Sequence, residues 1–215
     1  IIGNSGNNLI NGGLGNDTME GAAGDDIYIV GSSSDVVIDT SGNDTIRSTI
    51  DLTLQTGIEN GDLLGLLDLN LYGNSTANYL SGNSGDNLID GMGGADVLTG
   101  GRGEDGFIAS VNDGTADTIT DFVSGEDLLL VDALAFGLFN PVLPSDEFSG
   151  YLDTDQIGTI TNGVSDNATA AFQINNDTGD LKLDLNPNDS IDPLTIFHLD
   201  TGAPDLLPTD IYVLL

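Results

Sequence analysis

The sequence predicts an all-β fold, a right-handed parallel β-roll with 18 residues per coil that is followed by a β-rich C-terminal cap. Three observations predict it: a nine-residue repeat, two uniform columns within that repeat, and a change in composition after the repeat ends. A fixed short period is typical of solenoids, in which each unit buries its apolar face against its neighbours.

The repeat occurs in two arrays, over residues 3–47 and 73–108, and most of its units begin with glycine. Position 8 is apolar in all nine units, and position 6 is Asp or Asn in all nine. The position-8 residues are Ile10, Met19, Tyr28, Val37, Ile46, Leu80, Ile89, Leu98 and Phe107. The position-6 residues are Asn8, Asp17, Asp26, Asp35, Asp44, Asn78, Asn87, Asp96 and Asp105.

Each unit is expected to form a loop and then a short strand. Positions 1 to 6 are rich in glycine, which tolerates the backbone conformations of tight loops. Positions 7 to 9 alternate as a strand with position 8 facing inward. Nine residues then make half a coil, so loops two units apart stack on the same edge and bring Asp17 near Asp35 and Asp26 near Asp44. Like charges at such separations are costly unless a cation lies between them.

The charge of the chain supports bound cations. It has 35 acidic residues against three basic ones and a formal net charge of -32. Such a chain either stays disordered or is neutralised by cations, and its 39% content of hydrophobic residues favours folding with cations. The negative charge disfavours nucleic acid and anionic membrane surfaces as partners. The chain contains no run of 18 apolar residues, so no membrane-spanning helix is predicted.

Composition also predicts the domain organisation. Of the 30 glycines, 22 precede residue 109, and all six prolines follow residue 140. We expect the roll to span residues 1–131, with irregular coils at 48–72 and 109–131, and the cap to span 132–215.

The repeats GGLGNDTME at 12–20 and GGRGEDGFI at 100–108 resemble the nonapeptide of RTX (repeats-in-toxin) proteins, the calcium-binding β-roll proteins of bacteria. ADTITDFVSGEDLLLV at 116–131 and the segments after it resemble the C-terminal part of serralysin-type RTX proteins. The resemblance implies a protein that leaves the bacterium by type I secretion and folds outside the cell on calcium. Residues 210–215 resemble the terminal export signal of that family.

The resemblance also implies ligands. Each calcium would lie between loops 18 residues apart, one giving carbonyls from positions 2 and 4, the other from positions 1 and 3, and both their position-6 side chains. The implied sets are Ala22, Gly24 and Asp26 with Asp39, Ser41 and Asp44; Gly13, Gly15 and Asp17 with Val30, Ser32 and Asp35; Asn4, Gly6 and Asn8 with Gly21, Ala23 and Asp26; Asn83, Gly85 and Asn87 with Gly100, Arg102 and Asp105; and Asn74, Thr76 and Asn78 with Gly91, Gly93 and Asp96. Six oxygens in a flexible arrangement suit Ca²⁺ better than Mg²⁺.

Some positions depart from the pattern. Three repeats have Asn in place of Asp at repeat position 6, namely Asn8, Asn78 and Asn87. Asn has no charge, so the calcium sites that include these residues should bind the ion more weakly. Asp113, Asp117 and Asp121 are candidates for a last site, beyond the point where the register slips. A position-6 Asp can also be a turn residue that bonds its own backbone, although the registered column favours calcium. Residues 184–189 match only the start of an EF-hand loop, and a plain turn is the favoured interpretation.

No catalytic constellation is predicted. The chain has one histidine, His198, so a zinc site with two histidines is excluded within it, and it has no G-x-S-x-G motif or cysteine. The favoured function is a calcium-binding module that supports folding and type I secretion of an extracellular bacterial protein. Two alternatives stay open: a module that binds a cell surface or polysaccharide, and the tail of a secreted enzyme whose catalytic domain lies upstream.

Overall fold

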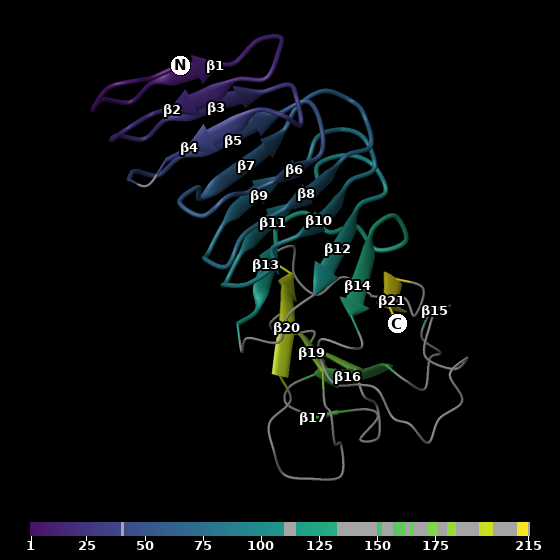
Figure 1. Cartoon of the computed structure of the whole chain (residues 1–215). Coiled ribbons are helices and arrows are strands. Elements are labelled where there is room, and N and C mark those ends of the chain that lie inside the picture. The colour runs from purple at the N-terminus through teal and green to yellow at the C-terminus, as the bar shows by residue number, and fades with distance from the viewer. Residues whose placement is uncertain are drawn as a thin grey trace.

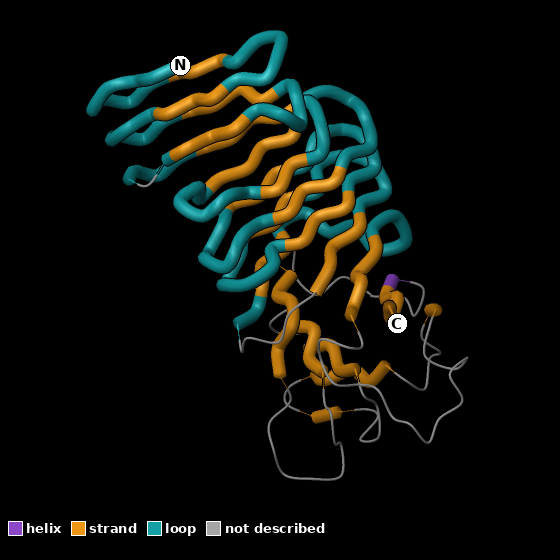
Figure 2. The backbone as a smooth tube through the Cα atoms, viewed as in Figure 1, coloured by secondary structure: helices purple, strands orange, loops and turns teal. Residues whose placement is uncertain are grey.

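The chain forms a parallel β-solenoid in which consecutive strands alternate between two facing sheets (Figure 1). The structure is a computed structural model, and it describes residues 1–39, 41–109 and 115–132, followed by segments at 150–151, 157–161, 164–165, 172–175, 180–183, 194–199 and 210–214. Within these residues, regular structure is almost entirely strand, and the strands are joined by loops along both edges of the roll (Figure 2). The predicted fold class, a parallel β-roll, is confirmed.

One sheet contains the odd-numbered strands of the roll. In spatial order these are β1 (Leu9–Asn11), β3 (Ile27–Val30), β5 (Thr45–Ser48), β7 (Asn60–Leu63), β9 (Tyr79–Ser81), β11 (Val97–Thr99) and β13 (Asp117–Ile119). It continues through β20 (Leu194–Leu199), β19 (Asp180–Leu183), β18 (Phe172–Asn175), β16 (Ile157–Thr161) and β17 (Val164–Ser165).

The facing side of the roll is divided in two. The larger part contains β6 (Leu52–Thr53), β8 (Asn70–Tyr72), β10 (Leu88–Asp90), β12 (Gly106–Ala109), β14 (Leu128–Asp132), β21 (Ile211–Leu214) and β15 (Gly150–Tyr151). The smaller part contains β2 (Thr18–Glu20) and β4 (Val36–Ile38), which pair with each other. Among the described residues, therefore, β4 and β6 are not paired, and the sheet is interrupted there.

The strand register shows where the coil length is constant and where it changes. Within the arrays the spacing is 18 residues, as Leu9 lies opposite Ile27 and Ile27 opposite Thr45. The next coil is shorter, because Thr45 lies opposite Asn60, 15 residues on. The last two coils are longer: Val97 lies opposite Thr118, at a spacing of 21, and Gly106 opposite Leu128, at a spacing of 22.

The core is a single column of apolar side chains between the two sheets. All nine position-8 residues are buried, as the repeat predicts, and they include Tyr28, Met19 and Phe107 at 0% exposure. The column continues through Leu52, Leu71, Ile119 and Leu129 into the C-terminal strands, where Phe197 and Ile211 are also fully buried. Burial of each such side chain contributes roughly 1.5–3 kcal/mol, so the column holds the short strands in place.

The C-terminal segments extend the roll at its last coil. Strand β20 pairs with β13 in parallel, and β21 pairs with β14 in parallel. The two open sheet edges of the final coil are thus covered by strands from far along the chain, as solenoids require at their ends.

Candidate metal sites

The position-6 side chains stack along the edges of the roll, 18 residues apart. The carboxylate of each later loop accepts a hydrogen bond from the backbone N–H of the position-6 residue one coil earlier. Asp26 accepts from Asn8 at 2.6 Å, Asp44 from Asp26 at 2.8 Å, and Asp35 from Asp17 at 3.0 Å. The structure therefore brings together the loop pairs that the repeat spacing predicts in the first array.

The second array has the same arrangement. Asp96 accepts from the N–H of Asn78 at 2.7 Å, and Asp105 from the N–H of Asn87 at 2.8 Å. All four side chains are buried, with at most 3% of their surface exposed.

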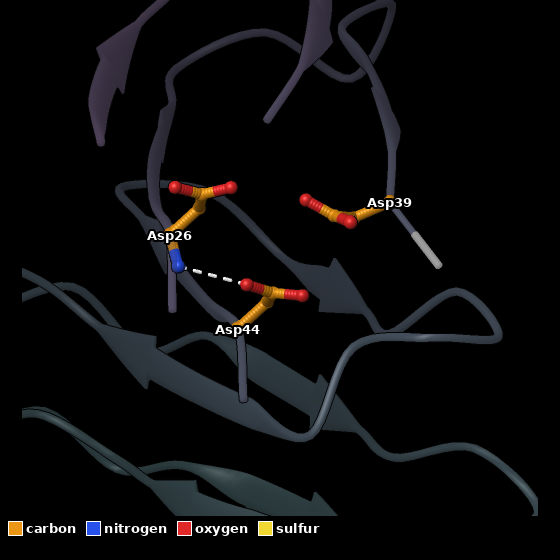
Figure 3. A group of neighbouring side chains, drawn as sticks. All are labelled: Asp26, Asp39 and Asp44. Atoms are coloured by element: carbon orange, nitrogen blue, oxygen red, sulfur yellow. Dashed lines mark hydrogen bonds between the residues drawn. The ribbon is translucent and has the colours of Figure 1, made fainter. Parts of the chain in front are cut away.

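The densest cluster lies in the first array and contains Asp26, Asp39 and Asp44 (Figure 3). One carboxylate oxygen of each lies within 4.8 Å of the others, and their exposed fractions are 0%, 6% and 0%. The second oxygens of Asp26 and Asp44 are buried and have no hydrogen-bond partner. Buried carboxylate oxygens without a donor are strongly unfavourable unless a cation compensates them.

The three carboxylates of this cluster fit beside one another because the adjacent residue, Gly21, has no side chain. A Cβ atom on Gly21 would lie 2.0 Å from Oδ2 of Asp26 and 2.6 Å from Oδ2 of Asp39, so any larger residue would close the space. The hydroxyl of Tyr28, a core residue, donates a hydrogen bond to Asp39. Three carboxylates form an all-oxygen donor set, which fits a hard divalent cation such as Ca²⁺.

Burial makes ionisation of Asp44, Asp105 and Asp127 costly in the absence of a cation. The pKa of Asp44 is raised from 3.8 to about 6, mainly by burial and also by the charges of Asp39, Glu59 and Asp26, against the lowering effect of the hydrogen bond from the Asp26 N–H. The pKa of Asp105 is likewise raised to about 6, mainly by burial and also by the charges of Asp127, Asp121 and Asp86, against the lowering effect of the hydrogen bond from the Asn87 N–H. The pKa of Asp127 is also raised by burial.

The loop backbones at positions 2 and 4 have the left-handed conformation over much of the arrays. Gly13, Gly15 and Gly24 have φ of 82°, 123° and 109°, and Ala22 and Met92 reach 82° and 66° without being glycine. Ser41 lies against Ala22, with its hydroxyl donating to the Ala22 carbonyl at 2.8 Å. The predicted partners in this pair of loops are therefore in contact.

The remaining residues that were predicted as calcium ligands also lie where two stacked loops meet. Ser32 donates its N–H to Asp35 at 3.2 Å, and Val30 is buried at the end of β3. A Cβ atom on Gly91 or Gly100 would lie 2.2 Å from Asp96 or 2.4 Å from Asp105, and one on Gly85 would lie 2.6 Å from the Leu67 carbonyl. The N–H groups of Gly93 and Arg102 donate to the carbonyls of Asn74 and Asn83, at 3.1 and 3.2 Å.

Asp117, one of the candidates for a last site, lies in these rows, and the structure adds Asp127 and Glu59, which the sequence analysis did not identify. Asp96 donates its N–H to Asp117, and Asp105 donates its N–H to Asp127, each at 3.0 Å. Both acceptors precede a buried apolar residue by two positions, like every position-6 residue, and that offset is the signal that could have found Asp127. Glu59 accepts the N–H of Asp44 at 2.9 Å in the 15-residue coil, where no repeat pattern exists.

The other residues that the sequence analysis considered do not belong to the stacked rows of position-6 side chains, or lie outside the described residues. Asp121 accepts hydrogen bonds from the N–H groups of Gly100 and Gly101, at 2.9 and 2.8 Å, so it caps a loop of the second array. Asp113 and residues 184–189 lie outside the described residues. Nδ1 of His198 lies 2.8 Å from Asp180 on the neighbouring strand.

Comparison with known families agrees with this geometry. The family model for the RTX calcium-binding nonapeptide repeat matches residues 1–28, 29–48 and 72–107, in four copies. The matched segments are the two arrays whose position-6 residues stack. No curated protein matches the chain. Among the described residues, none forms a helix with the length and apolar character needed to span a bilayer.

The raised pKa values predict that acid opposes cation binding. An Asp with a pKa of about 6 in the calcium-free fold and 3.8 when unfolded binds its proton more tightly when folded. The calcium-free fold therefore loses stability as pH rises through 6, whereas a bound cation needs the ionised form. We therefore expect chelated protein to contain more β structure at pH 5 than at pH 7, and the gain in β structure on adding calcium to be smaller at pH 5. Circular dichroism with chelator and with calcium at both pH values measures it, and equal spectra of the chelated protein at pH 5 and pH 7 would contradict the assignment.

Proposed function

We propose that this parallel β-roll, whose two arrays match the RTX calcium-binding nonapeptide repeat, acts as a calcium-dependent folding and secretion module of an extracellular bacterial protein. The observation that carries the proposal is the buried Asp26–Asp39–Asp44 cluster, in which two carboxylate oxygens have no donor. The β-roll itself is a structural, calcium-binding module and not a catalytic one. Any enzymatic activity of the parent protein would belong to another domain.

The proposed mechanism follows from the charge of the chain. Without calcium, stacking two loops forces buried carboxylates together at the edge of the roll, so the extended chain is favoured. Calcium, when bound, supplies the positive charge that the stacked carboxylates lack. Asp26 and Asp44 would then hold the ion with their second oxygens, while their Oδ1 atoms keep the hydrogen bonds that fix the loops. Binding free energy thereby becomes folding free energy.

The proposal requires that the calcium-free chain be largely unfolded. We expect the far-ultraviolet circular dichroism spectrum to change from disordered to β-rich when calcium is added to chelated protein, and to revert with chelator. A control with Mg²⁺ at the same concentration should give little β structure, because Mg²⁺ needs a stricter octahedral site. A β-rich spectrum that chelation leaves unchanged would contradict calcium-driven folding.

The carboxylate of Asp26 should contribute more to calcium affinity than that of the adjacent Asp25. Asp26→Asn removes one charge from the buried cluster, and Asp25→Asn removes one from an exposed side chain on the same loop. We expect Asp26→Asn to raise the calcium midpoint roughly tenfold or more, because affinity depends on the number of charged ligands, and Asp25→Asn to shift it little. Isothermal titration would distinguish them, and similar shifts for both would refute the assignment of Asp26 as a ligand.

The position of the C-terminal residues supports export before folding. Asp210 is 1% exposed and accepts hydrogen bonds from the Ser124 hydroxyl at 2.6 Å and the Gly125 N–H at 3.1 Å. Residues 211–214 of the segment that resembles an export signal form β21, which pairs with β14 and β15 inside the folded sheet, so a transporter could not read the segment there. We propose that the secretion machinery recognises it only in the unfolded chain.

This part of the proposal has its own test in a bacterial host that carries a type I exporter. We expect the whole chain to reach the medium and a variant without residues 210–215 to stay in the cell. A matched variant, Asp25→Asn, should be exported normally, since Asp25 lies far from the C-terminal strand. Undiminished export of the truncated chain would overturn the assignment of the signal.

A further inference from the structure

Two loops of the second array make a different kind of junction with the coil before them. Both have Asn at position 2 and position 6: Asn74 and Asn78 in one, Asn83 and Asn87 in the other. Their amide groups point to backbone carbonyls of residues 55–69, which belong to the irregular coil (48–72) that lacks the repeat.

In the first of these junctions, one amide spans the preceding loop. Nδ2 of Asn74 donates to the carbonyls of Gln55 and Ile58 at 3.0 and 2.8 Å. Nδ2 of Asn78, which is 1% exposed, lies 3.3 Å from the carbonyls of both Ile58 and Glu59. Two side chains thus supply donors to three carbonyls of the earlier loop.

The second junction repeats the arrangement on the other edge. Nδ2 of Asn83 donates to the Leu67 carbonyl at 3.0 Å and lies 3.5 Å from that of Leu64. Nδ2 of Asn87, a residue that is 3% exposed, donates to the Leu69 carbonyl at 3.2 Å. The same two repeat positions therefore serve the same purpose in both loops.

The amide oxygens are occupied as well, within their own loops. Oδ1 of Asn78 accepts the N–H of Asn74 at 2.8 Å, and Oδ1 of Asn87 accepts that of Asn83 at 2.7 Å. This contrasts with the first array, where the position-6 Asp uses Oδ1 for the earlier coil and leaves Oδ2 without a donor in Asp26 and Asp44. The side chains at positions 2 and 6 of these loops are neutral amides whose donors and acceptors have partners, so they present no uncompensated charge to a cation.

We infer that asparagine amides replace calcium at these two junctions, between residues 55–59 and 73–78 and between residues 64–69 and 82–87. Carbonyl oxygens that would otherwise need a cation receive N–H donors instead, and an ion is excluded because the amide hydrogens occupy the space between the loops. The middle of the roll is therefore joined without calcium, and calcium acts on the arrays at either side. The inference refines the proposed function by stating where in the roll calcium is not used.

A single substitution distinguishes an amide junction from an ion site. Asn74→Asp keeps the size of the side chain and the acceptor for Thr76, whose N–H lies 2.9 Å from Oδ1. It replaces the two donors to Gln55 and Ile58 with a negative oxygen that faces two carbonyls. Ser75→Asp, on the exposed neighbouring residue, adds the same charge without touching the junction.

We expect Asn74→Asp to lower the melting temperature in saturating calcium by about 5 °C or more, and Ser75→Asp to change it by less than about 2 °C. The number of calcium ions per chain, counted by native mass spectrometry, should be the same in both variants and the parent. The parallel pair Asn83→Asp and Ser84→Asp tests the second junction in the same way.

Two outcomes would overturn the inference. A calcium count that falls by one when Asn74→Ala removes the amide would show that the junction of the parent holds an ion. A melting temperature equal to that of Ser75→Asp would show that the amide contributes nothing. If Asn74→Asp does not fold even with calcium, Asn74→Ala removes the donors without adding charge and should still lower the melting temperature. If the chain binds no calcium at all, the proposed function fails, but the melting-temperature difference between the paired variants still tests the junction.

Discussion

Stacking buried carboxylates at a fixed spacing is the constraint on which this structure depends. The position-8 column needs every coil to sit directly on the one before it, because short strands have too little apolar surface to be stable alone. That stacking also brings the position-6 side chains of successive coils together, where Asp26 and Asp44 are fully buried. Coil stacking therefore buries the apolar position-8 side chains and, at the same time, brings the negatively charged position-6 side chains together. In an 18-residue coil the first effect cannot occur without the second.

The chain joins its stacked loops with three different side chains. Aspartate leaves an oxygen for an ion, as in Asp26 and Asp44. Asparagine brings its own donor, as in Asn78. Glu59 uses a longer side chain to reach the Asp44 N–H across a coil that is three residues shorter than the repeat. Each solution satisfies the same backbone spacing, which explains how the roll passes through an irregular segment without losing its sheets.

The sequence predicted the period, the inward column and the pairing of loops, because each depends on residue types that recur at a constant interval. It missed Asp127, since the coil before it has four extra residues and breaks the interval, although the apolar Leu129 still follows two positions later. It could not reveal the contact of Tyr28 with Asp39, because a position-8 residue is identified only as apolar and buried. It could not predict the direction of the Asn78 and Asn87 amides, since that depends on which carbonyls the preceding coil offers.

The interruption between β4 and β6 has a mechanical consequence. The first array joins the rest of the roll by strand pairing on one side only, through β5 and β7, within the residues that the structure describes. A pulling force applied at the N-terminal end would be resisted there by one ladder of hydrogen bonds, whereas the coils farther along share the load between two. The first array would thus detach as a unit before the remaining coils open, with the interruption as the point of failure.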